Sequence, residues 1–212
     1  MSMTLLAMAL LLVACGGYGS YETGFDERDG WGVGDTVEVE GMVADGAYRM
    51  RVDAERGIFW STAGISAGDG TYVVEATQTA GPLDNGFGLM FMVDPEALDF
   101  YLFEISGDGY VWLGRCEGGC EGNQVILVDE GWFEAPAIKQ GLNEMNRLRV
   151  EVKDGNMIFY VNGTEVGRGV DTAFTAGDVG VLVETLGEGG VEVEFDNFRY
   201  TPDPDDASFF GG

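Results

Sequence analysis

The stretch Met157-Ile-Phe-Tyr-Val-Asn-Gly-Thr-Glu-Val-Gly167 indicates how this chain folds. Apolar and β-branched residues run up to Val161 and resume after Gly163. Asn162 and Gly163 are the residue types that a two-residue hairpin turn needs, because both of its central positions take a positive φ. The stretch therefore predicts two antiparallel strands joined by a tight turn. Asn162-Gly-Thr164 also matches a glycosylation sequon, but its alternating flanks favour the hairpin.

The same pattern of short strands and turns continues on both sides of this hairpin. Turn sequences such as Asp84-Asn-Gly, Gly107-Asp-Gly and Asp154-Gly-Asn separate apolar or alternating runs, and 35 glycines suit many turns. Scarcely any helical period and no long internal repeat is visible. We predict an all-β fold, a two-sheet antiparallel jelly-roll sandwich. The predicted strands are 36–41, 48–52, 57–60, 72–79, 88–93, 100–106, 110–113, 125–128, 147–153, 157–161, 164–167, 178–184 and 191–200.

The N-terminus resembles a bacterial lipoprotein signal peptide. Residues 5–14 read LLAMALLLVA without a charge, and small Ala14 precedes Cys15, whose thiol would take the lipid. A membrane-spanning helix needs roughly 20 apolar residues, so this segment is too short to span a bilayer. We expect residues 1–14 to be removed and Cys15 to carry acyl chains such as palmitate. The alternative is an ordinary secretory signal in which Cys15 is incidental.

This interpretation predicts an exported protein, anchored by lipid to the cell membrane or outer membrane and facing the periplasm or cell exterior. Residues 15–30, rich in Gly, Tyr and acids, are expected to form a flexible tether from the lipidated cysteine. The jelly-roll domain should cover residues 31–201. Residues 202–212 then form an acidic, proline-containing tail that ends in Phe209-Phe210 and a Gly pair.

The charge balance limits the partners. The chain has 37 acidic and 11 basic residues, a formal net charge of −26. Such a surface repels nucleic acid and anionic lipid, but it admits neutral sugars and cations. Abundant carboxylates with only two lysines also suit a salt-rich habitat, because a well-hydrated surface keeps a protein soluble there.

Two cysteines remain after Cys15. Cys116 and Cys120 are separated by Glu-Gly-Gly, a spacing that can bring their Cβ atoms together. Because an exported compartment permits disulfides, we predict a small loop-closing disulfide. Two free thiols or half of a metal site are the alternatives. A structural zinc site takes four ligands, and the chain has no histidine and no further cysteine to complete one.

An ordered set of motifs resembles the concanavalin A-like jelly-roll superfamily, more narrowly its LamG-like and 3-keto-disaccharide hydrolase-type domains in exported bacterial proteins. The resemblance covers roughly residues 31–201 and implies two curved antiparallel sheets packed about 10 Å apart. Where related domains carry a basic or polar residue, this chain continues Met90-Phe-Met-Val93. The motifs are Asp84–Leu89, Phe100–Trp112, Ala137–Asn143, Asn146–Val150, Gly155–Gly163, Asp171–Phe174, Gly177–Gly180 and Phe195-Asp-Asn-Phe198.

No catalytic residue is predicted, and a pair of carboxylates among the 37 acidic residues is the alternative left open. Without histidine, a His-dependent triad or a His-based acid–base pair is excluded. Glycosidases work with two carboxyl groups about 5–10 Å apart. The E-x-D-x-x-E run of laminarinase-like hydrolases on this fold is missing, and Glu38-Val-Glu40 and Glu192-Val-Glu194 are typical of solvated strand faces.

Aromatic residues are the best candidates for ligand binding, because a flat ring stacks on the apolar face of a sugar. Tyr110 and Trp112 alternate onto one strand face, and Trp132 lies in the acidic loop Asp129-Glu-Gly-Trp-Phe-Glu134. For each of them, burial in the core is the alternative. Trp132 is the least core-like of the three, because charged residues and Gly flank it.

No cofactor is predicted, and calcium is the metal that the acidic residues could bind. Asp171 with Asp178 or Asp196 could gather oxygen ligands at one rim of the sandwich. The alternative is that these residues are solvated turn aspartates.

We therefore expect a membrane-anchored lipoprotein whose jelly-roll domain binds a ligand without catalysis, with glycan as the ligand. One alternative is a glycan-processing hydrolase of the 3-keto-disaccharide type, which would show converging acids of raised pKa. The other is a structural surface or filament subunit that self-associates through sheet edges.

Overall fold

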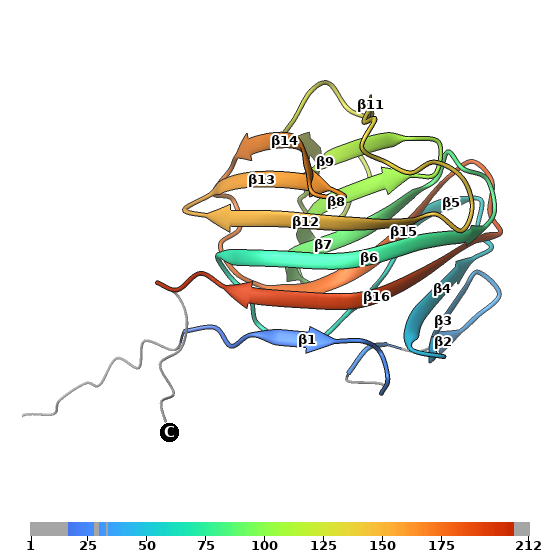
Figure 1. Ribbon diagram of the computed structural model, residues 1–212, viewed down its shortest axis with the longest axis horizontal. Helices are drawn as coiled ribbons and strands as arrows, with labels where there is room; N and C mark the ends of the chain where they lie inside the picture. The colour runs from blue at the N-terminus through green and yellow to red at the C-terminus, as the bar shows by residue number, and fades with distance from the viewer. Residues whose placement is uncertain (1–16, 28–29, 33, 206–212) are drawn as a thin grey trace, which may run out of the picture.

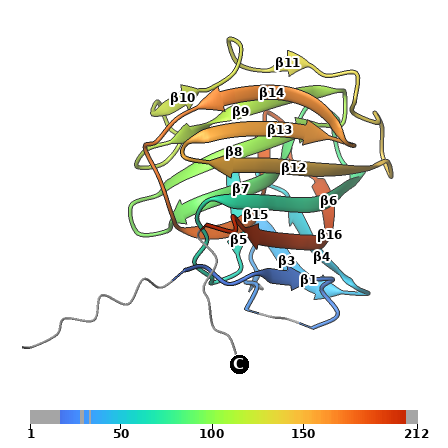
Figure 2. The same ribbon diagram turned by 60° about the vertical axis from the view of Figure 1, so that its left-hand side comes forward.

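The computed structural model describes residues 17–27, 30–32 and 34–205 (Figure 1). Over these residues the chain forms strands and no helix. Accordingly, the described part holds no helix that could cross a membrane. The strands build two antiparallel sheets stacked as layers, which a second view shows from another side (Figure 2). The predicted two-sheet sandwich is confirmed.

The larger sheet has nine strands. Its order is β14-β13-β12-β6-β16-β4-β3-β2, and β1 also pairs with β16. The strands are β1 (Tyr21–Thr23), β2 (Gly34–Asp35), β3 (Val39–Ala44), β4 (Ala47–Val52), β6 (Gly70–Ala80), β12 (Met145–Lys153), β13 (Asn156–Val161), β14 (Thr164–Val170) and β16 (Val191–Pro202).

The smaller sheet has seven strands. Its order is β10-β9-β8-β7-β15-β5, and β11 also pairs with β9. The strands are β5 (Arg56–Thr62), β7 (Gly86–Asp94), β8 (Asp99–Ser106), β9 (Tyr110–Cys116), β10 (Gln124–Ile126), β11 (Phe133–Glu134) and β15 (Asp178–Leu186).

The core lies between the two sheets. Alternate residues of each strand point into it because side chains alternate across a strand. Phe103 on β8 meets Phe159 on β13 edge to face, with ring centroids 5.3 Å apart. Phe195 and Phe198 of the Phe-Asp-Asn-Phe motif are both fully buried. The last strand therefore closes the core.

The hairpins follow their turn residues. Asn162 and Gly163 take φ values of 51° and 83°, which is the conformation that the Asn-Gly turn requires. All thirteen predicted strands are present. The first of them, predicted at 36–41, is β3, which lies further toward the C-terminus. Sequence reasoning missed β1, β2 and β11. These strands have two or three residues, too few to show an alternating pattern.

The N-terminal segment differs from the expected flexible tether. Tyr21–Thr23 pair with β16, and the side chains of Phe25 and Trp31 are almost fully buried. The Phe25 and Trp31 rings lie 5.0 Å apart. The described part of residues 15–30 thus belongs to the sandwich, because its aromatic residues bury apolar area that composition alone did not reveal.

The two ends of the chain extend beyond the described residues. The predicted signal peptide, Cys15 and the Phe209-Phe210 pair all lie there. Of the acidic tail, Asp203 is fixed: its N–H donates to the Asp69 carbonyl at 3.0 Å, and its carboxylate bonds Lys153 at 3.0 Å.

The predicted disulfide is confirmed. Cys116 at the end of β9 is bonded to Cys120, with their Cα atoms 4.9 Å apart. Cys116 is buried, so the bond fixes the start of the loop between β9 and β10 to the sheet.

Candidate functional site

The side of the seven-stranded sheet that faces away from the nine-stranded sheet, here called the seven-stranded outer face, carries a second apolar cluster. It is separate from the core between the sheets. Its buried members come from four neighbouring strands and from the disulfide: Met90, Val93, Phe100, Leu102, Trp112, Cys116 and Leu182. A solvent-facing side of a sheet is usually polar, so an apolar cluster there is unusual. It marks this face as a candidate interaction site.

Two glutamates lie within this apolar face. Glu104 on β8 is opposite Gly88 of β7, and Glu184 on β15 is opposite Gly86 of the same strand. With one strand between them, their Cα atoms are about 12 Å apart, so the two side chains can point toward each other. Glu104 is 1% exposed, and its Oε1 has no hydrogen-bond partner.

Burial changes the ionisation of both acids. Desolvation raises the pKa of Glu104 well above its usual value, and the charge of Glu184 raises it further. Desolvation raises the pKa of Glu184 to about 7, against a smaller lowering by Arg56. Both shifts have the same cause: an apolar surrounding disfavours the charged carboxylate.

Gly86 makes room for an indole over Glu104. A Cβ atom at Gly86 would lie 2.8 Å from Glu104 Oε1 and 3.1 Å from Cη2 of Trp132. The Trp132 ring and the Glu104 carboxyl therefore come together over Gly86, in the space that a larger side chain would fill. Trp132 also packs against the apolar cluster and so shields Glu104 from water.

The structure brings the three predicted aromatic residues together. Tyr110 and Trp112 lie on β9, and Trp132 directly precedes β11, which pairs with β9. Trp112 is only 6% exposed and is opposite Glu104, so it belongs to the buried part of this face. The Tyr110 hydroxyl donates to Glu134 Oε1 at 3.3 Å, and the negative charge of Glu134 raises the Tyr110 pKa. Trp132 is half-buried and can contact a ligand.

Trp60 adds a more exposed ring. It lies on edge strand β5, is 38% exposed, and packs with Phe100 of β8 at a centroid distance of 5.9 Å. Strands β15 and β7 lie between β5 and β8 in the sheet. The Trp60 and Phe100 side chains thus reach toward each other across two strands of this face.

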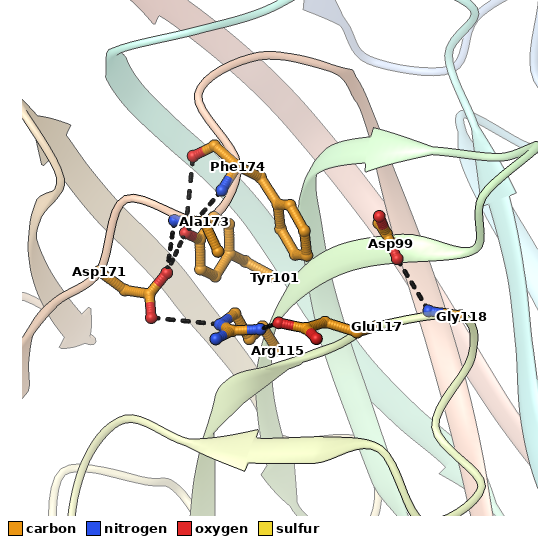
Figure 3. Close-up of polar contacts among 8 residues, drawn as sticks. All are labelled: Asp99, Tyr101, Arg115, Glu117, Gly118, Asp171, Ala173 and Phe174. Atoms are coloured by element: carbon orange, nitrogen blue, oxygen red, sulfur yellow. Dashed lines mark hydrogen bonds and ion pairs between the residues drawn. The ribbon is translucent and has the colours of Figure 1, made fainter.

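Asp171, one of the aspartates considered for calcium, instead belongs to an ion-pair network (Figure 3). Tyr101 Oη donates to Asp171 Oδ1 at 2.6 Å, and Arg115 Nε donates to Oδ2 at 3.1 Å. Burial opposes ionisation of Asp171. Hydrogen bonds from Tyr101, the Ala173 N–H and Arg115 outweigh burial and lower its pKa. Arg115 also pairs with Glu117 and lies over the Phe174 ring. Both oxygens of the Asp171 carboxylate therefore accept hydrogen bonds from the protein itself.

Asp178 and Asp196 have other partners. The Asp178 carboxylate accepts N–H bonds from Gly64 at 3.0 Å and Ile65 at 2.9 Å. Asp196 is opposite Glu75 on β6 and accepts from the Asn197 N–H. Within residues 17–27, 30–32 and 34–205, no three His, Cys, Asp or Glu side chains are grouped as metal ligands. The structure therefore does not bring the three aspartates to one site.

Sequence reasoning missed Glu104, Glu184 and the exposure of Trp60. A signal for the acids was present: after the first residue, each strand carries one acid among uncharged and mostly apolar residues, in DFYLFEIS and DVGVLVETL. A lone acid at such a position must either face solvent or be buried with a raised pKa.

Comparisons with known proteins bear on the fold. No family model and no curated protein matches the chain. Among solved structures, the carbohydrate binding module CBM66 from Bacillus subtilis matches with a TM-score of 0.63 and 21% identity, covering 81% of this chain and 96% of that one. The β-glucanase of Bacillus licheniformis matches with a TM-score of 0.64 and 13% identity, covering 87% and 99%.

A Bacillus subtilis protein of unknown function with a galectin-like fold matches with a TM-score of 0.61 and 13% identity, covering 85% of this chain and 94% of that one. At these identities the matches show the fold. Together with the two antiparallel sheets, they show that the chain is a concanavalin A-like jelly-roll sandwich.

Proposed function

We propose that this protein binds a neutral glycan on the seven-stranded outer face and does not cleave it. The observation that carries this proposal is the meeting of Trp132 with the Glu104 carboxyl across Gly86, on the same face as the more exposed Trp60. Aromatic rings stack on the apolar faces of sugars, and a carboxyl group such as that of Glu184 accepts hydrogen bonds from hydroxyls. The net charge of −26 disfavours an anionic polysaccharide.

The proposed protein acts outside the cytoplasm, held to a membrane through acylated Cys15. The uncharged run before Cys15 supports export, and the Cys116–Cys120 disulfide suits an oxidising compartment. An anchored binding domain would keep its glycan ligand close to the cell surface.

A glycan hydrolase is the second candidate. The Glu104–Glu184 pair favours it, because the raised pKa of one acid is what a general acid needs. However, a catalytic acid must reach the substrate, and Glu104 is 1% exposed beneath Trp132. Non-catalytic binding is therefore the better-supported function.

A glycan array probed with the full chain carrying Cys15→Ser, which prevents acylation, tests this proposal. We expect binding to neutral oligosaccharides that remain intact after prolonged incubation. Cleavage of a bound oligosaccharide would establish the hydrolase, and failure to bind any neutral glycan would overturn the proposal. Repeating the array with EDTA tests whether calcium takes part.

A further inference from the structure

The chain is fixed to the sandwich very soon after the proposed lipid attachment site. The Tyr18 ring packs so closely on Gly68 that a Cβ atom there would collide with it. Tyr21–Thr23 then pair with Phe198–Tyr200 of β16. Tyr18 and Tyr21–Thr23 are therefore part of the domain, and the chain between them cannot serve as a tether.

Only Gly16 and Gly17 lie between Cys15 and Tyr18. Three residue steps span at most about 11 Å, even when fully extended. Acyl chains on Cys15 must enter the bilayer, so the Cys15 backbone lies at the membrane surface. We infer that one end of the sandwich, the end around Tyr18, rests directly against the lipid headgroups. This inference rests on the lipid anchor in the proposed function.

The residues around Tyr18 define this contact end. A hollow of about 480 Å³ beside the Tyr18 ring is lined by Asp69, Asp154, Thr175 and others. Lys153 nearby bonds Asp203 at 3.0 Å and Asp205 at 2.8 Å. Figures 1 and 2 show that β1 begins and β16 ends at this same end of the sandwich.

The negative charge of the contact end determines which lipid headgroups it can approach. Four aspartates near Tyr18 outnumber the neighbouring base Lys153: Asp69, Asp154, Asp203 and Asp205. A bilayer rich in anionic lipid repels such a surface, and one of zwitterionic headgroups does not. The partner is thus a bilayer surface of low charge.

This orientation places the candidate site away from the membrane. The strands run from the contact end to the far end of the sandwich, and Glu104 lies five residues along β8 from Asp99. Five residues of strand span about 17 Å. The seven-stranded outer face then runs roughly parallel to the membrane normal, with Glu104 and Trp132 held away from the bilayer.

Two matched threonines can test this orientation. Thr175 is exposed at the contact end, and Thr164 is exposed at the far end, beside the Asn162-Gly163 turn. With Cys15 acylated and Cys116 bonded to Cys120, a cysteine introduced as Thr175→Cys or Thr164→Cys is the free thiol to label. The acylated protein is labelled with a fluorophore and reconstituted in phosphatidylcholine vesicles that carry a headgroup nitroxide quencher.

We expect at least twofold stronger quenching at position 175 than at position 164. Inserting twelve Gly and Ser residues between Gly16 and Gly17 should make the two positions equal. Equal quenching without the insertion, or stronger quenching at position 164, would overturn the orientation alone. If the protein fails to float with the vesicles, the lipid anchor is wrong, and the orientation falls with it.

Discussion

The two outer faces of this sandwich differ in where their charges lie. The seven-stranded outer face encloses Glu104 and Glu184 among aromatic and aliphatic side chains. The nine-stranded outer face instead carries partly exposed pairs such as Arg49–Glu194, with 35% and 32% of their side chains exposed. There Arg149 also lies 3.8 Å from the centre of the Tyr160 ring.

The charged groups of the two faces have different roles. An exposed ion pair is screened by water and adds little free energy, so it serves solubility. A carboxyl enclosed by apolar groups destabilises the fold when it ionises, and such a group is typical of functional sites. The same alternation of side chains produced both faces, and only one of them combines buried acids with accessible aromatic rings.

The largest expected effect is a loss of stability with rising pH caused by the buried acids. A carboxyl whose folded-state pKa is raised contributes stability that is full below its unfolded pKa near 4.5 and is lost as pH rises through its folded pKa, about 7 for Glu184. A difference of this size amounts to about 3 kcal/mol. Acids of lowered pKa, such as Asp171 and Asp203, are already ionised above pH 5 and do not mask the trend.

Urea unfolding at pH 5 and pH 8 measures this effect. We expect the double variant Glu104→Gln/Glu184→Gln to remove most of the decline in the free energy of unfolding. The double variant Glu55→Gln/Glu188→Gln, which removes two carboxylates from exposed positions, should leave most of it. If both variants flatten the pH dependence equally, general charge repulsion and not burial is the cause.

A charge enclosed between the sheets should also matter more than a pair on the surface. Arg115→Ala leaves Asp171 largely buried without its cation, the two side chains being 13% and 15% exposed. We expect a loss of about 2 kcal/mol in unfolding free energy, less than for a fully buried pair. Arg168→Ala breaks a surface pair with Glu165 and should cause no measurable change. If both variants lose the same unfolding free energy, the burial of the Arg115–Asp171 pair adds nothing to its contribution to stability.

The aromatic residues test which face binds the ligand. Trp132→Ala should weaken glycan affinity about tenfold, or about 1.4 kcal/mol, because it removes the stacking ring above Glu104. Tyr160→Ala removes a ring from the nine-stranded outer face and should leave affinity unchanged. Titration calorimetry with a glycan identified on the array compares them. A stronger effect of Tyr160→Ala would move the site to the opposite face.

The smallest expected effect concerns the surface pairs of the nine-stranded outer face. Arg49→Ala removes the 2.7 Å contact with Glu194 and should cost about 0.5 kcal/mol. The effect should disappear in 1 M salt, because salt screens exposed charges. A larger, salt-independent loss would show that these pairs carry more of the stability than their exposure indicates.

Sequence reasoning predicted the strands well because alternation and turn chemistry act locally. Asn162-Gly163 and Cys116/Cys120 were sufficient to indicate a hairpin and a disulfide. The site was predicted only in part. Trp132 was identified by its polar neighbours, whereas Glu104 is buried by residues from other strands and by Trp132 itself, 28 positions further along the chain.

The sequence by itself determined that this chain forms antiparallel strands, that two of its cysteines pair, and that its surface is strongly acidic. These properties depend on neighbouring residues and on composition. The tertiary structure alone decided that Tyr18 and β1 belong to the domain, that Asp171 pairs with Arg115, and that two glutamates and an indole share one face. Such contacts join strands far apart in the chain, so their energies appear only once the sheets have formed.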